Sequence, residues 1–179
     1  MKKAIFLDRD GVINKVKVIN GKPYAPNHFN EIILFPNLKK ILNILRGLGY
    51  LIIVITNQPD VKRKKTSLAT VIKINKFIKK SLPVDDILVC FHDNDDKCKC
   101  RKPKPGNILL AAKLYNINLK NSYMIGDTWK DITAGRKAGC KTIFLDHGYN
   151  IKKPKNYNFK VKSMKELIKI ISINNKKLI

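Results

Sequence analysis

The chain has 179 residues, of which 44% are hydrophobic, and its 37 Lys and Arg residues against 13 Asp and Glu residues give a formal net charge of +24. The hydrophobic share argues against a disordered chain, and no apolar run approaches the ~18 residues that cross a bilayer. The lysines are spread along the sequence without interleaved aromatic residues, so we interpret the charge as a compositional bias and expect neither a nucleic-acid nor a membrane partner.

Short apolar runs alternate along the chain with segments whose apolar residues recur every three or four positions. The runs predict buried strands, and the periodic segments predict helices. In chain order, the pattern predicts a strand at 3–7, a helix from 36 to about 47, a strand at 51–55, a helix at about 66–80 and a strand at 86–90. It then predicts a helix from 105, a strand at 122–125, a helix at 130–138, a strand at 141–145 and a last helix opened by a capping box at 163–166. The segments 14–31 and 91–104 show neither period and are expected to be irregular.

This alternation predicts an α/β fold, a three-layer, doubly wound, Rossmann-like parallel sheet with helices on both faces. No internal repeat or low-complexity linker divides the sequence, so we expect a single domain over residues 1–179. The first apolar run stops at Asp8, too early for a secretory signal, and we therefore expect a cytoplasmic protein.

Polar side chains follow three of the predicted strands, at the point where each strand ends. Asp8 and Asp10 follow the first strand, Thr56-Asn57-Gln58 ends the second, and Asp127, with Asp131 one helical turn later, follows the fourth. In parallel sheets the functional groups gather at these carboxyl ends. A carboxylate can attack phosphorus to form an aspartyl-phosphate, while a second one protonates the leaving oxygen and then activates water.

Adjacent carboxylates repel a phosphate, so this chemistry needs a divalent cation and a positive side chain. Asp127 is suited to complete an oxygen-ligand site for Mg²⁺. The positive side chain is expected from the segment Arg101-Lys102-Pro103-Lys104-Pro105-Gly106. Its two prolines stiffen the backbone and limit the entropy lost when a Lys or Arg is held on a phosphate.

Three of the four cysteines lie within eleven residues, in a segment with no helical or strand period. Cys90, His92, Cys98 and Cys100 supply three thiolates and one imidazole, which is a closed zinc set. We expect a structural Zn²⁺ that orders the loop at about 90–104. Free thiols, and the neighbouring aspartates as ligands, stay open as alternatives.

The order of these motifs resembles that of the haloacid dehalogenase superfamily of phosphatases, which is DxD, then Ser or Thr, then Lys, then GDxxxD. The resemblance covers roughly residues 1–148. It implies that Asp8 is the nucleophile and Asp10 the general acid and base. It also implies that Thr56 and Lys102 hold the phosphoryl group.

By the same resemblance, Mg²⁺ is held by the Asp8 carboxylate, the Asp10 backbone carbonyl and Asp127. The segments FLDRDGVIN, VITNQ and CRKPKPG, together with the zinc loop, look more closely like the heptose-bisphosphate phosphatases, a subgroup with little or no cap domain. This closer resemblance implies that Arg101 recognises the substrate. It places Asn57 and Gln58 where the subgroup's substrate contacts lie.

The sequence departs from that subgroup at two places. The residues 59–64 lack two glycines that usually follow the T-N-Q motif, and Thr128-Trp129 stands where a Lys often follows the aspartate of the G-D motif. We expect a monomeric, Mg²⁺-dependent phosphatase for a small phosphorylated sugar of activated-heptose synthesis. A histidinol-phosphate phosphatase is the first alternative. A nucleic-acid 3′-phosphatase and a non-catalytic, zinc-containing nucleic-acid-binding module are the others.

Overall fold

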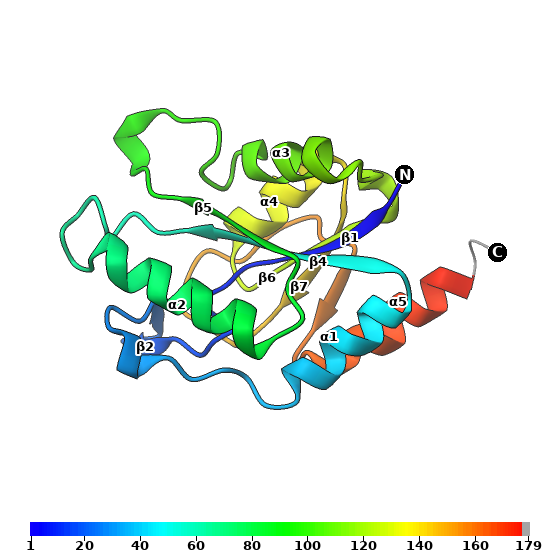
Figure 1. Cartoon of the computed structure of the whole chain (residues 1–179), viewed down its shortest axis with the longest axis horizontal. Coiled ribbons are helices and arrows are strands. Elements are labelled where there is room, and N and C mark those ends of the chain that lie inside the picture. The colour runs from blue at the N-terminus through cyan, green and yellow to red at the C-terminus, as the bar shows by residue number, and fades with distance from the viewer. Residues whose placement is uncertain (177–179) are drawn as a thin grey trace.

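Six parallel strands form one sheet in the order β5-β4-β1-β6-β7-β8 (Figure 1). They are β1 (Lys3–Leu7), β4 (Tyr50–Asn57), β5 (Asp86–Cys90), β6 (Tyr123–Gly126), β7 (Lys141–Leu145) and β8 (Phe159–Val161). The computed structural model describes residues 1–176, and the side chains of residues 1–173, so the last three residues of the predicted domain lie outside it. The predicted parallel α/β fold is confirmed.

Helices cover both faces of the sheet because the central strands are apolar on both sides. They are α1 (Leu38–Gly47), α2 (Leu68–Ser81), α3 (Gly106–Tyr115), α4 (Trp129–Ala138) and α5 (Lys165–Lys176). In β1, Ile5 and Leu7 belong to the core under α1, α2 and α5, while Ala4 and Phe6 belong to the core under α3 and α4 (Figure 1). The predicted three layers follow from this alternation.

A hairpin of β2 (Lys17–Ile19) and β3 (Lys22–Tyr24) lies in a segment that the sequence predicted to be irregular. Its strands have three residues each and are largely exposed, so they carry no apolar period. The signal that marks the hairpin is its Asn20-Gly21 turn, where both residues have positive φ, as a type I′ turn requires. The edge strand β8 was also not predicted, because three residues are too few to show a period.

The start of α1 and the capping of α5 differ from the prediction. α1 begins at Leu38 rather than at Pro36, because Asn37 between them takes a left-handed φ of 60°. At the start of α5, the Glu166 carboxylate accepts hydrogen bonds from the Ser163 hydroxyl and from the backbone N–H of the residue before it, a variant of the predicted capping box. Short 3-10 helices occur at η1 (Phe29–Glu31), η2 (Asn94–Asp96) and η3 (Leu119–Asn121).

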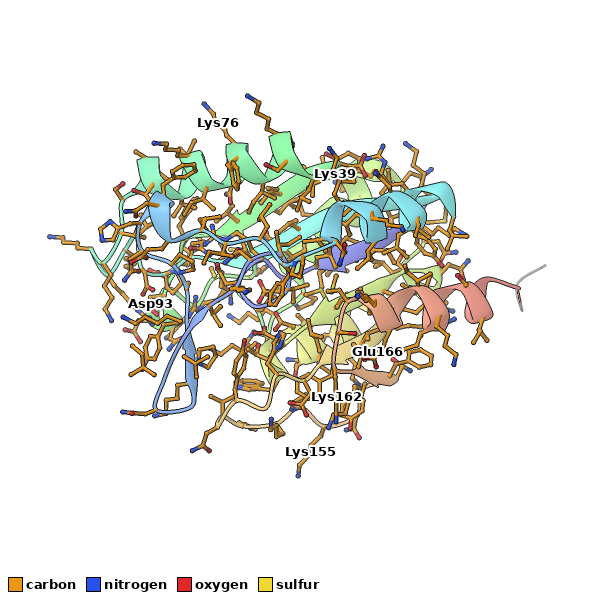
Figure 2. The ribbon with its side chains drawn as sticks, turned by 90° about the horizontal axis from the view of Figure 1, so that it is seen from below. Lys39, Lys76, Asp93, Lys155, Lys162 and Glu166 are labelled. Carbon is orange, nitrogen blue, oxygen red and sulfur yellow. The ribbon has the colours of Figure 1, made fainter. Side chains whose placement is uncertain are left out.

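The surface lysines are distributed over several elements. Figure 2 labels Lys39 on α1, Lys76 on α2, and Lys155 and Lys162 in the segments before α5, at separate places on the molecule. No helix within residues 1–176 is long and apolar enough to cross a membrane.

Candidate active site

The three polar strand ends converge because β4, β1 and β6 are neighbours in the sheet. Leu7 of β1 is level with Val54 of β4 on one side and with Ile125 of β6 on the other. Parallel strands in this register deliver the residues that follow them to one edge of the sheet. Asp8 and Asp127 therefore meet at this edge, although 118 residues of chain separate them.

A buried lysine lies between these strand ends. The Lys102 ammonium is 2.8 Å from Asp8 Oδ1 and 2.6 Å from Asp131 Oδ1, and it donates a hydrogen bond of 2.7 Å to the Ile55 carbonyl. Burial alone would lower the pKa of Lys102, but the charges of Asp131 and Asp8 outweigh it and raise that pKa. The lysine is thus held positive where a phosphate would approach Asp8.

Three carboxylates surround the same point. Asp8, Asp127 and Asp131 each place one oxygen within 4.8 Å of the others. Burial and the charge of Asp131 raise the pKa of Asp8 to about 7, against the opposing charge of Lys102. Burial and the neighbouring carboxylates also raise the pKa of Asp127.

This charge balance fits a divalent cation. Three carboxylates with one ammonium leave two uncompensated negative charges when all are ionised. The buried Oδ1 of Asp127 has no hydrogen-bond partner among the described residues. Carboxylate oxygens are the ligands that Mg²⁺ prefers, so the residues present suit the predicted ion.

Two glycines let the backbone approach these carboxylates. A Cβ at Gly11 would lie 1.9 Å from Asp127 Oδ2, and a Cβ at Gly126 would lie 2.1 Å from Asp131 Cβ. At the start of α4, the Thr128 N–H and hydroxyl donate to Asp131 Oδ2 at 3.0 and 2.6 Å. The other oxygen of Asp131 is thereby directed to the buried ammonium, so this residue supports the site.

The Asp10 carboxylate has a separate set of partners. It accepts hydrogen bonds from the Arg9 guanidinium at 3.0 Å, from Asn14 at 3.0 Å and from Gln58 at 2.7 Å. Arg9 is fully buried and also donates to Asn75 of α2 at 3.2 Å. Donors on both oxygens fix the orientation of the carboxylate beside Asp8.

The T-N-Q segment contacts catalytic candidates. Asn57 Nδ2 donates to the Lys102 carbonyl at 3.0 Å, and its Oδ1 accepts from the Lys102 N–H at 3.1 Å. Gln58 Nε2 donates to the Thr56 hydroxyl at 2.9 Å in addition to its bond to Asp10. Asn57 lines the cavity over Asp8, whereas Thr56 and Gln58 are buried behind that wall.

The four predicted zinc ligands come together. Cys90 Sγ lies 3.8 Å from Cys98 Sγ, 3.2 Å from Cys100 Sγ and 3.6 Å from His92 Nδ1. A tetrahedral ion with Zn–S bonds of ~2.3 Å separates its sulfurs by about 3.8 Å. The donor set and its spacing therefore fit one zinc ion.

The aspartates beside the cysteines have basic partners. Arg63 Nε is 2.6 Å from Asp93 Oδ2, and Arg63 also contacts Asp60 at 3.3 Å. Lys62 forms an ion pair with Asp96. These pairs connect the segment after β4 to the zinc loop. The sequence did not predict this connection, because charge runs 30 residues apart carry no pairing information.

Arg101 lies between the zinc loop and the catalytic candidates. Its Nε donates to Asn94 Oδ1, and its Nη1 donates to the His92 carbonyl, each at 3.1 Å. The guanidinium is thus held by a residue of η2 and by the backbone of a predicted zinc ligand. The position of this side chain depends on the order of the loop.

A cavity of about 260 Å³ opens over Asp8. Arg63, Arg101 and Lys130 also line this cavity. Burial and the nearby charge of Arg101 lower the pKa of Lys130, so an anion placed between these two cations would be stabilised. The sequence did not single out Lys130, since a lysine on the first turn of a helix is common in this lysine-rich chain.

Three comparisons place the chain among known proteins. Residues 15–139 match the model of the haloacid dehalogenase-like hydrolases. The chain is 34% identical over 175 residues to the D-glycero-beta-D-manno-heptose-1,7-bisphosphate 7-phosphatase of Helicobacter pylori, with 94% of this chain and 97% of the relative covered. It is 39% identical over 158 residues to the D-glycero-alpha-D-manno-heptose-1,7-bisphosphate 7-phosphatase of Photorhabdus laumondii, with 80% and 81% covered.

A solved structure has the same fold. It is the D,D-heptose 1.7-bisphosphate phosphatase from B. bronchiseptica complexed with magnesium and phosphate. The TM-score is 0.77 at 24% sequence identity, and the match covers 96% of this chain and 99% of that one.

Proposed function

This chain belongs to the haloacid dehalogenase-like hydrolase family, and from that premise we propose that it removes the 7-phosphate of D-glycero-D-manno-heptose 1,7-bisphosphate. The product would enter the synthesis of nucleotide-activated heptose. The names of the relatives support this substrate.

The observation that carries the proposal is that one cavity holds the catalytic candidates together with further cations. Lys102 lies beside Asp8, and Arg101 and Lys130 line the same cavity. A sugar with two phosphates would have its reacting phosphoryl group at Asp8 and its other phosphate at Arg101 and Lys130. A monophosphate would leave these two cations without an anion.

The Asp8 and Asp127 carboxylates, with the Asp10 backbone carbonyl, would hold Mg²⁺. The ion would supply positive charge that screens Asp8 from the phosphoryl oxygens and stabilises charge in the transition state. Asp131 is engaged with Lys102 and the start of α4, which leaves it a supporting role.

The reaction has two steps. An Asp8 carboxylate oxygen attacks phosphorus, the bond from phosphorus to the sugar oxygen breaks, and Asp10 gives its proton to that oxygen. Asp10 then takes a proton from water, the water oxygen attacks the aspartyl-phosphate, and phosphate leaves as the Asp8 carboxylate re-forms. Lys102 would bind the phosphoryl oxygens throughout, with Asn57 holding the Lys102 backbone. The buried Thr56 hydroxyl would hold Gln58 beside Asp10.

Gln58 is expected to act through Asp10 rather than through the sugar. Replacing it in Gln58→Met keeps the side-chain length and removes the donor to Asp10 and Thr56. We expect kcat to fall by roughly 10- to 100-fold with little change in KM, because a misplaced general acid costs rate and not binding. Steady-state kinetics with the bisphosphate measures both constants. A raised KM at unchanged kcat would instead indicate that Gln58 contacts the substrate directly, as the family resemblance implies.

We also propose that Cys90, His92, Cys98 and Cys100 bind a structural zinc ion. The spacing of the four donors supports it, and all four positions of a tetrahedral ion would be filled by the protein. The role of the ion would be to hold a loop that has little apolar packing of its own, and with it the side chain of Arg101.

The substrate is tested by phosphate release from heptose 1,7-bisphosphate, heptose 7-phosphate and histidinol phosphate in the presence of Mg²⁺. We expect the highest kcat/KM with the bisphosphate. Arg101→Met and Lys130→Met should each lower that value by roughly 10- to 100-fold, since a hydrogen bond to a charged group contributes about 1.5–3 kcal/mol. With p-nitrophenyl phosphate, which has no second phosphate, the loss should be smaller.

Lys137→Met is the matched control, because it removes the same charge two turns farther along the same helix, at a residue that does not line the cavity over Asp8. It should leave kcat/KM for the bisphosphate close to that of the unmodified chain. Faster turnover of histidinol phosphate than of the bisphosphate would contradict the sugar substrate and favour a histidinol-phosphate phosphatase. Equal losses from Lys130→Met and Lys137→Met would assign the effect to net charge.

A further inference from the structure

The loop that leaves β7 carries two aromatic residues with no part in the chemistry described above. His147 and Tyr149 lie on either side of Gly148, which has a φ of 77°. Their rings are 5.3 Å apart, and the His147 ring stacks on Phe35 at 5.5 Å with an interplanar angle of 5°. The two side chains are thus packed into one group behind the candidate metal site.

The loop is fixed on both sides of these residues. The Asp146 carboxylate contacts Lys153 at 3.0 Å and Lys160 at 2.8 Å, and it accepts the Gly148 N–H at 2.9 Å. Farther along, the Asn150 N–H donates to the carbonyl of Gly21 in the β2–β3 turn at 2.7 Å. Groups attached to this loop are therefore held in place without help from a ligand.

His147 reaches the loop that follows the nucleophile. Its Nε2 lies 2.7 Å from the carbonyl oxygen of Gly11. A carbonyl only accepts hydrogen bonds, so Nε2 carries the proton and donates. Gly11 follows Asp10 directly, and its backbone is in van der Waals contact range of Asp127, where a Cβ would not fit. The imidazole therefore fixes the peptide next to two proposed ligands.

Tyr149 reaches Asp127 itself. Its phenol lies within hydrogen-bonding reach of the Asp127 carboxylate, and a phenol O–H donates to a carboxylate oxygen. Asp127 Oδ1 has no partner among the described residues, whereas Oδ2 faces Gly11. Oδ1 is the oxygen that remains for a cation.

We propose that His147 and Tyr149 are positioning residues for the divalent cation, an inference that rests on the proposed Mg²⁺ site. Tyr149 would orient Asp127 so that Oδ1 faces the ion, and His147 would hold the Gly11 peptide that bears against the other oxygen. Residues that orient metal ligands in this way typically change metal affinity by about 10- to 100-fold when they are replaced. Neither side chain touches the ion or the substrate in this assignment.

The test is direct binding of Mn²⁺, a paramagnetic substitute for Mg²⁺, measured on the whole chain by electron paramagnetic resonance in the absence of substrate. Tyr149→Phe removes one oxygen, and His147→Phe keeps an aromatic ring on Phe35 while it removes the donor. Each should raise the Mn²⁺ dissociation constant by roughly 10-fold or more. His147→Gln, which offers an amide donor in the same direction, should bind Mn²⁺ more tightly than His147→Phe.

Tyr157→Phe is the matched control, since Tyr157 packs on Phe144 in the same stretch of chain, away from the carboxylates. It should bind Mn²⁺ like the unmodified chain. Thermal unfolding with and without Mn²⁺ serves as a second readout, because weaker binding reduces the stabilisation that the ion gives to the folded state.

Asp127→Asn distinguishes a failure of the metal site from a failure of the positioning role. If Asp127→Asn loses Mn²⁺ while Tyr149→Phe and His147→Phe bind it normally, the metal site stands and the positioning role is wrong. If Asp127→Asn binds Mn²⁺ normally, the proposed metal site fails and the positioning role fails with it. A loss of metal-free stability in Tyr149→Phe and His147→Phe, without a change in the Mn²⁺ dissociation constant, would also overturn the proposal.

Discussion

Asp8→Asn should abolish phosphatase turnover, with kcat lowered by at least about 10⁴-fold, because removal of a covalent nucleophile leaves only binding and electrostatic effects. The amide has nearly the shape of the carboxylate but cannot form the aspartyl-phosphate. Phosphate release from the bisphosphate and from p-nitrophenyl phosphate measures the loss. Both substrates should be affected equally, since Asp8 would react with the phosphoryl group of either.

The same variant should fold normally in the absence of metal. Burial and the charge of Asp131 raise the pKa of Asp8 to about 7, so the ionised carboxylate is unfavourable in the metal-free fold. Its neutral replacement removes that repulsion, and Lys102 keeps its contact with Asp131 at 2.6 Å. Zinc content should also be unchanged.

Asp86→Asn is the control for this variant, because it makes the same chemical change at the amino end of β5, where Asp86 contacts Lys79 and Tyr115. Its turnover should match that of the unmodified chain. Turnover retained in Asp8→Asn would refute the nucleophile assignment.

Cys100→Ala should lose zinc and, with it, the order of the loop at about 90–104. Cys100 Sγ lies 3.2 Å from Cys90 Sγ and from His92 Nδ1, and 3.5 Å from Cys98 Sγ, so its loss opens the whole set. Structural zinc contributes about 10 kcal/mol or more of binding free energy in small zinc domains. We expect less than one tenth of the zinc content of the unmodified chain by elemental analysis, and a lower midpoint of thermal unfolding.

The catalytic effect of zinc loss should depend on the substrate. Arg101 is held by the His92 carbonyl and Asn94 within the loop, whereas Lys102 is held by Asn57 and Ile55 of β4. Disorder of the loop should therefore displace Arg101 more than Lys102. We expect kcat/KM for the bisphosphate to fall by roughly 100-fold, and less for p-nitrophenyl phosphate.

Cys140→Ala is the matched control. Cys140 is a buried thiol in the core under α3 and α4, outside the four-residue set, and its truncation costs about 1 kcal/mol of packing. Zinc content should remain at one equivalent in this variant. Equal zinc content in Cys100→Ala and Cys140→Ala would remove the zinc proposal, and the cluster would then consist of free thiols.

The sequence predicted the strands and helices that bury apolar side chains, because burial imposes a period on them. Lys3–Leu7, Asp86–Cys90 and Lys141–Leu145 have the predicted bounds. The β2–β3 hairpin and β8 bury too little to leave a period, and they were missed. The Asn20-Gly21 pair nevertheless indicates the turn of the hairpin, because the positive φ of both residues is a preference of these two residues themselves.

For the site, the sequence by itself identified the reactive residue types and the order of their motifs. This was possible because phosphoryl transfer requires carboxylates and a cation, and a zinc site requires clustered thiols, in any fold. Only the tertiary structure decided which of them touch. It directs Gln58 to Asp10, Asn57 to the backbone of Lys102, and His147 and Tyr149 to the Gly11–Asp127 contact. These contacts join residues that are 22 to 136 positions apart, where the sheet order and the loop paths, and not any local pattern, set the distance.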